Sequence, residues 1–90
     1  MHNVSRNKIS SSELVILRHL GDSNAARDRR ITEITEISVT TGIRDNDEVL
    51  RALYTLEGKN LVEPEPKGDF TSNRWQITDV GLRALQLFSA

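Results

Sequence analysis

The sequence predicts a single α+β domain that is mostly helical, and three observations lead to this prediction. Hydrophobic residues recur at three- and four-residue spacing in several segments, which is the pattern of amphipathic helices. Helix-start signals precede these segments. One short segment near the C-terminal end alternates apolar and polar residues, as a half-buried strand does. The length of 90 residues is enough for one modest hydrophobic core.

The composition is that of an ordinary folded chain, with 37% apolar and 28% charged residues. The absence of cysteine excludes disulfide frameworks and cysteine-based zinc sites, and it fits an intracellular protein. No apolar run approaches the ~18 residues of a membrane span, and the first ten residues lack the apolar centre of a signal peptide. We therefore expect a cytoplasmic protein that does not associate with membranes. Residues 1–9 show no periodicity and predict a flexible arm before one domain at 10–90.

The net charge of −1 is unevenly distributed along the chain. Residues 1–30 contain six basic and three acidic side chains, whereas residues 31–90 contain six basic and ten acidic ones. Nucleic-acid binding draws much of its affinity from neutralised phosphates. Any basic surface must therefore depend mainly on the first third of the chain.

A capping box starts the first predicted helix. Ser10 and Glu13 are three residues apart, so that the side chain of each can bond the backbone amide of the other. This signal predicts a helix over 11–20, which Gly21 would end. The polar, unpatterned segment 22–30 is predicted as a loop. The core-facing residues predicted here are Leu14 and Leu17, with Val15 and Leu20 as further candidates.

A short strand at 30–33 and a short helix are predicted next. The helix has two candidate caps, Thr32 and Thr35. We favour Thr35, because it leaves more room for the strand and puts Gly42 in the following turn, where positive φ must be tolerated. The β-branched run 37–41 is poor helix material, so tertiary packing must stabilise this helix.

The segment 41–62 carries the clearest amphipathic pattern. Asp45 is the predicted N-cap, and Glu48 would return its hydrogen bond in a variant of the capping box. Gly58 or Asn60 would adopt the left-handed conformation at the end of the helix. The residues predicted to be buried are Val49, Ala52, Leu53 and Leu56. The residues predicted on the opposite face are Asn46, Asp47, Leu50, Arg51 and Tyr54.

Two strands, at 61–65 and 74–78, are predicted to form a hairpin. Two prolines blunt the first strand, and the sequence Lys67-Gly68-Asp69 is typical of a turn. The second strand alternates, and we expect Trp75 to be a core residue at the base of the hairpin rather than a platform for stacked bases.

Thr78 would cap a final helix at 79–89. Apolar residues cover more than one stripe of this helix. A helix so apolar on a small domain predicts a partner, and we expect a homodimer. The residues predicted at the dimer interface are Leu82, Leu85 and Phe88.

The order helix, strand, helix, turn, helix, hairpin, helix resembles the winged-helix DNA-binding domains of MarR- and PadR-type bacterial and archaeal regulators. The resemblance covers about residues 10–88 and is carried by ITEISVTTGI (34–43), VLRALYTLEGKNLVE (49–63) and RWQITDVGLRAL (74–85). It implies a winged helix-turn-helix with a three-helix core, a two- to three-stranded wing sheet and a C-terminal helix. The sequence departs from the family pattern by one additional residue between Gly42 and Asp45.

The resemblance implies sequence-specific binding of double-stranded DNA and regulation of transcription. The helix at 45–58 would enter the major groove, and the wing at 64–74 would lie along the backbone. The implied base-facing residues are Asn46, Asp47, Leu50, Arg51 and Tyr54, with Arg51 suited to guanine, Asn46 to adenine and Asp47 to cytosine. The implied phosphate contacts are Thr40, Thr41, Arg44, Lys67, Asn73 and Arg74, with Arg29 and Arg30 as further candidates. In such a homodimer, the two recognition helices would lie ~34 Å apart on a pseudo-palindromic site.

The charges keep a protein partner as an alternative to DNA, and the residue types argue against an enzyme or a metal site. Residues 44–59 contain three basic and four acidic side chains, and an exposed Leu50 would make this surface more apolar. A protein partner that binds Leu50, Tyr54 and the wing is therefore the alternative to DNA. We expect no enzyme, cofactor or metal site, since the sequence has no glycine-rich phosphate loop and no nucleophile–base spacing. His2 and His19 have no second ligand at metal-binding spacing.

Overall fold

A computed structural model describes residues 9–27 and 31–89 of the chain. The predicted arm at 1–8 and the candidate phosphate contacts Arg29 and Arg30 lie outside the described residues. The elements, in order, are α1 (Ser11–Arg27), β1 (Thr32–Glu33), α2 (Ile34–Thr41), α3 (Asn46–Gly58), β2 (Val62–Pro64), β3 (Arg74–Ile77) and α4 (Asp79–Ser89).

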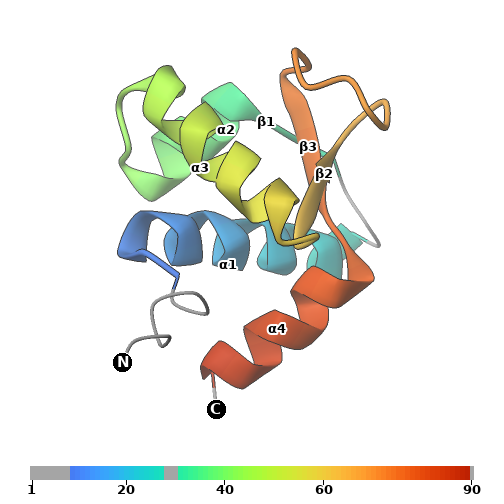
Figure 1. Ribbon diagram of the computed structural model, residues 1–90. Coiled ribbons are helices and arrows are strands. Elements are labelled where there is room, and N and C mark those ends of the chain that lie inside the picture. Colours follow the sequence, from blue (N-terminus) through green and yellow to red (C-terminus); the bar gives the residue numbers. More distant parts are fainter. Residues whose placement is uncertain (1–8, 28–30, 90) are drawn as a thin grey trace, which may run out of the picture.

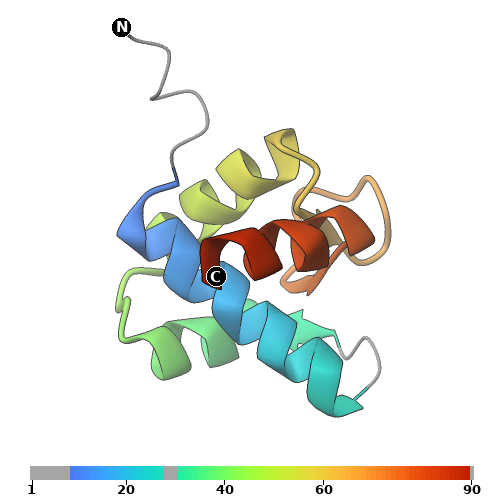
Figure 2. The ribbon, with the colours of Figure 1, turned by 90° about the horizontal axis from the view of Figure 1, so that it is seen from below.

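The described elements form a mostly helical α+β fold with α1 at its centre. On one side of α1 lie α2, α3 and the sheet, and on the other side lies α4 (Figures 1 and 2). The sheet is antiparallel in the order β1-β3-β2, with Thr32 opposite Trp75 and Val62 opposite Ile77. The fold class predicted from sequence is thus confirmed at the α+β level. The arrangement is compatible with a winged helix.

Helix α1 begins as predicted but ends later. Ser10 Oγ accepts a hydrogen bond from the Glu13 amide, and Glu13 Oε1 accepts one from the Ser10 amide, each at 3.2 Å. The predicted stop at Gly21 is wrong, because the helix continues to Arg27. Gly21 is buried within the helix, and a Cβ there would overlap a δ-methyl group of Leu85 in α4. This glycine therefore allows two helices to approach closely instead of ending one of them.

Helix α2 uses neither predicted cap. Its N-cap is Glu33, whose side chain makes no capping hydrogen bond, while Thr32 lies buried in β1. The predicted left-handed turn at Gly42 is confirmed, with φ of 80° and a hydrogen bond from its amide to the Ser38 carbonyl at 3.0 Å. Buried Ile37 packs this β-branched helix into the core, as its poor intrinsic propensity requires.

Helix α3 has well-defined ends. Asp45 is the N-cap, as predicted, and its Oδ1 accepts a hydrogen bond from the Asp47 amide at 2.9 Å. At the other end the left-handed residue is Asn60, with φ of 65°. Its amide donates to the Glu57 carbonyl, and the Leu61 amide donates to the Leu56 carbonyl, which is a Schellman motif. The four residues predicted to be buried on α3 are all buried.

One hydrophobic core joins the helices to the sheet. Trp75 is fully buried, and its indole nitrogen donates to the Ser72 carbonyl at 3.1 Å, so the predicted core role is confirmed. In α1, Leu17 and Leu20 are buried, but Val15 is 42% exposed and Ile16 takes the core position instead. The core consists of Ile16, Leu17, Leu20, Ile34, Ile37, Val49, Ala52, Leu53, Leu56, Leu61, Val62, Trp75 and Ile77.

The start of α4 is tied to the end of α3. Thr78 Oγ1 accepts from the Gly81 amide at 2.9 Å, which confirms the predicted cap, and donates to the Asn60 carbonyl at 2.6 Å. Gly81 lies against the Leu61 carbonyl so closely that a Cβ would overlap the backbone. Within residues 9–27 and 31–89, no helix is both long and apolar enough to cross a membrane.

Candidate nucleic-acid interface

The outer side of α3 forms an accessible surface between the α2–α3 turn and the hairpin. Asn46, Asp47 and Arg51 are exposed there, as the sequence predicts. Leu50 is half-buried and packs against the core, so the expectation of an exposed Leu50 is wrong. Its position near the core follows from its place next to Val49 on the rim of the buried stripe.

Tyr54 is tied to the hairpin. Its hydroxyl donates to the Phe70 carbonyl at 2.8 Å, and its ring lies edge-on to Phe70 at 6.5 Å and tilted against Trp75 at 6.1 Å. The side chain remains 44% exposed. Tyr54 therefore holds the loop of the hairpin against α3, so that two parts of the predicted DNA-binding surface keep a fixed spacing.

The turn before α3 contains the predicted phosphate contacts Thr40, Thr41 and Arg44. Thr40 and Arg44 are exposed. The hydroxyl of Thr41, however, donates to the Ile37 carbonyl at 2.6 Å and accepts from the Ile43 amide at 3.3 Å. Thr41 thus stabilises the turn through its side chain, which leaves Thr40 and Arg44 as the available contacts.

The hairpin carries the remaining predicted contacts. Lys67, Asn73 and Arg74 are all exposed. Lys67 Nζ lies 3.8 Å from Glu63 Oε1, but the lysine side chain is 80% exposed, so this pair is weak. Arg74 is the first residue of β3, at the loop end of that strand, and Lys67 is in the loop between β2 and β3.

Several carboxylates on this surface have local partners. Asp45 caps α3, and Asp69 Oδ1 accepts hydrogen bonds from the Thr71 amide at 3.1 Å and the Thr71 hydroxyl at 2.6 Å. Glu63 accepts from Gln76 Nε2 at 2.9 Å in addition to its contact with Lys67. Donors next to a carboxylate offset part of its charge, so these acidic groups oppose an anionic ligand less than the sequence count indicates.

The guanidinium groups on the same surface are free of such partners. Arg44, Arg51 and Arg74 are exposed, and none forms an ion pair with another residue in the described part of the chain. Three exposed carboxylates, Glu33, Asp47 and Glu48, likewise lack an ion-pair partner among those residues. The uncompensated charge of the surface is therefore mixed, with three cations and three anions.

A cavity of about 190 Å³ lies between the start of α2, the start of α3 and the loop end of β3. We call it the α2–α3–wing cavity. It is lined by Glu33, Ile34, Thr35, Asn46, Leu50 and Asn73. Sequence reasoning identified three of these residues as DNA contacts but did not predict that they share a cavity, since Asn46 and Leu50 lie on α3 whereas Asn73 lies in the hairpin.

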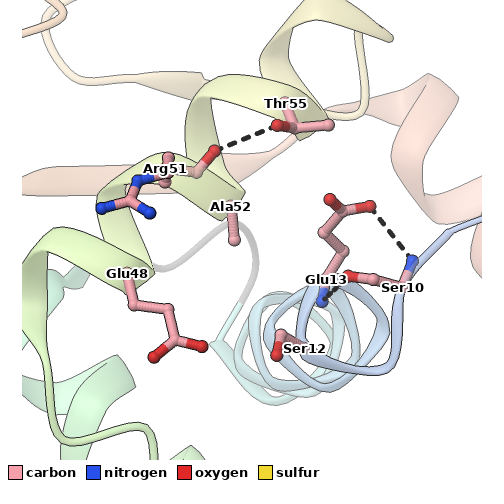
Figure 3. A pocket seen from close by; sticks show the side chains of 7 residues that line it. All are labelled: Ser10, Ser12, Glu13, Glu48, Arg51, Ala52 and Thr55. Carbon is pink, nitrogen blue, oxygen red and sulfur yellow. Dashed lines mark hydrogen bonds between the residues drawn. The ribbon is translucent and has the colours of Figure 1, made fainter.

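A second hollow of about 200 Å³ separates the start of α1 from α3. Ala52 points into it, while the Arg51 side chain extends away from Ser10 and Glu13 (Figure 3). Glu13 is occupied by the Ser10 amide and lies 3.9 Å from Lys59 Nζ. Among the charged residues that line it, this hollow thus adds only Arg51 and Glu48 as groups able to bind a ligand.

The three residues of α4 that are predicted at the dimer interface do not share one exposed surface. Leu82 and Leu85 are half-buried and pack against the core of their own chain, and the side chain of Phe88 lies outside the described residues. The apolar side chains that α4 leaves exposed are Val80 at 47% and Leu87 at 79%. Sequence periodicity found both stripes but could not tell which of them α1 covers.

His19 of α1 contacts α2. Its Nε2 lies 3.4 Å from Glu36 Oε2 of α2, and only 14% of its side chain is exposed. In residues 9–27 and 31–89 no group of three or more His, Cys, Asp or Glu side chains could hold a metal ion. His2 lies outside the described residues.

Comparison of the chain with protein-family models, with curated proteins and with solved structures finds no match.

Proposed function

We propose that the chain is a winged-helix regulator of transcription that binds specific sequences of double-stranded DNA. In this proposal α3 enters the major groove, and the wing at 64–74 lies along the backbone. One observation carries the proposal. The exposed side of α3 and the two segments that flank it present three guanidinium groups, Arg44, Arg51 and Arg74, with no ion pair among the described residues.

The positions of these arginines suggest different roles. Arg51 is in the second turn of α3, beyond Asn46 and Asp47, where side chains would reach base edges. Arg44 precedes the helix and Arg74 is at the loop end of β3, so each would meet a phosphate beside the groove. The hydrogen bond from Tyr54 to the Phe70 carbonyl supports this division, because it fixes the distance between helix and wing before DNA binds.

A protein-binding module remains the second candidate, and a specific observation favours it. Asp47 and Glu48 are exposed carboxylates without an ion-pair partner in the described part of the chain, and Val39 of α2 is 82% exposed. A basic protein surface would complement these two carboxylates better than phosphate would, and an apolar residue beside it could cover Val39. The two candidates differ in their dependence on salt, which is steep for DNA.

The test is a salt series of binding to duplex DNA by the wild type and two arginine variants. We expect log K to fall with log salt concentration by about 0.9 per phosphate contacted, and Arg44→Gln to lower that slope by about 1. Arg51→Gln should cost about 1–3 kcal/mol on a selected site and relax the preference at one base pair.

Arg83→Gln is the matched control, because Arg83 is an exposed arginine of α4, on the far side of α1 from α3 (Figure 1). It should leave the slope unchanged. No measurable binding to duplex DNA, or a slope that changes equally in all three variants, would contradict DNA binding through α3 and favour the protein-binding module.

The homodimer stays part of the proposal, with its contacts revised. Since Leu82 and Leu85 are packed against the core of their own chain, a dimer formed through α4 would use the exposed stripe of Val80 and Leu87. Two copies related by a two-fold axis would then read a pseudo-palindromic site.

A further inference from the structure

The α2–α3–wing cavity combines an apolar floor with neutral hydrogen-bonding groups. Ile34 is 4% exposed and Leu50 is half-buried, so both offer an aliphatic surface at the bottom of the cavity. The side-chain amides of Asn46 and Asn73 line it as well, and neither is hydrogen-bonded to another described residue. These groups are able to bind a ligand that is apolar in one part and polar at its edge.

The residues that line the cavity argue against two other occupants, a phosphate group and a base that has left the duplex. The charged group among the lining residues is the carboxylate of Glu33, which repels phosphate. No aromatic side chain is among those residues, so the cavity offers no platform for stacking a base that has left the duplex. A base edge within the intact duplex is the part of DNA that fits.

We propose that this cavity receives the 5-methyl group of a thymine, so that the chain selects A·T base pairs there. Thymine presents its methyl group in the major groove, where aliphatic side chains contact it, and adenine offers two atoms that an asparagine can bind at once. Leu50 contacts the methyl group and Asn46 binds adenine. The two residues are four apart on α3 and therefore lie next to each other on its surface. This inference rests on the proposed DNA binding and names the sequence class that it reads.

The experiment removes single methyl groups from the DNA. A preferred duplex is first selected from a library with a random central segment. The thymines of that duplex are then replaced one at a time by uracil, which differs only by the missing 5-methyl group. For the wild type we expect about a fourfold loss of affinity at one thymine in each half-site, as the burial of a methyl group predicts. The Leu50→Ala variant should bind the thymine duplex and the uracil duplex with equal affinity.

Controls separate loss of contact from loss of folding. Leu50→Met keeps most of the aliphatic surface and should keep the sensitivity to uracil. Val39→Ala removes an exposed aliphatic side chain of α2 that does not line the cavity, and it should also keep that sensitivity. Asn46→Ala should lower the affinity for the selected duplex by about 5- to 150-fold, but change the affinity for random DNA little.

The outcomes distinguish this inference from the proposed function. Selective binding with equal affinity for thymine and uracil at every position would overturn the methyl contact and leave the proposed function standing. Persistent sensitivity to uracil in Leu50→Ala would overturn the assignment of that contact to the cavity. Failure to select any duplex would overturn both.

Discussion

The two sides of α1 share one hydrophobic core but differ in the contacts that supplement it. On the α3 side, side-chain hydrogen bonds to the backbone position the turn, the helix and the wing, as in the bond from Tyr54 to the Phe70 carbonyl. On the α4 side, two buried glycines allow backbone and apolar side chains to approach closely. The outer surface of α3 stays accessible, whereas the contact between α1 and α4 is closely packed.

The largest loss of stability is expected from a substitution on the α4 side of α1, where backbone and side chains are closely packed. Gly81→Ala would place a Cβ against the Leu61 carbonyl and Ile77, and a backbone carbonyl cannot move away as a side chain can. We expect a loss of about 3 kcal/mol in the free energy of unfolding, measured by chemical denaturation. Gly58→Ala in α3 is the control, because nothing lies within 4 Å of its Cβ position. It should be neutral or stabilise by about 0.5–1 kcal/mol. Equal effects of the two substitutions would contradict the close contact at Gly81.

A smaller effect is expected where the contact is with a side chain. Gly21→Ala would meet the end of Leu85, which can change its rotamer, so we expect a loss of about 1–2 kcal/mol. In the double variant with Leu85→Ala the cost of the added methyl group should vanish. A double-mutant cycle measured by denaturation tests this coupling, and simple additivity of the two changes would show that the residues do not touch.

The smallest effect is expected on the hydrogen-bonded side. Tyr54→Phe removes the bond to the Phe70 carbonyl but keeps the aromatic contacts, and should cost about 0.5–1 kcal/mol in stability, since the bond is exposed. If the bond fixes the spacing of helix and wing, DNA affinity should fall by more than stability does. The measurement pairs denaturation with binding to a selected duplex. Unchanged affinity would indicate that the wing does not contribute to binding.

Local signals predicted where α1, α3 and α4 begin and which side of α3 is buried, but not where α2 begins. Ser10, Asp45 and Thr78 all act as caps, because a cap depends on residues within one turn of it. The end of α1 could not be predicted in this way. Gly21 is a typical helix stop by sequence, and only its contact with Leu85, far away in the chain, explains why the helix continues.

The candidate site was predictable only in part for the same reason. Amphipathic spacing identified Asn46 and Arg51 as exposed, since periodicity decides which way a helical residue points. It could not predict that Leu50 and Asn73 line one cavity, or that Tyr54 contacts Phe70. These contacts depend on how the hairpin folds back over α3, which is a property of the tertiary structure.

The hydroxyl of Thr78 has a mechanical consequence. One oxygen atom bonds both the Asn60 carbonyl, just beyond α3, and the Gly81 amide, in the first turn of α4. The Leu61 carbonyl accepts the Thr78 amide beside it, at 3.0 Å. These three hydrogen bonds link the end of α3 directly to the start of α4. A ligand that tilted α3 would therefore be expected to move the start of α4 as well.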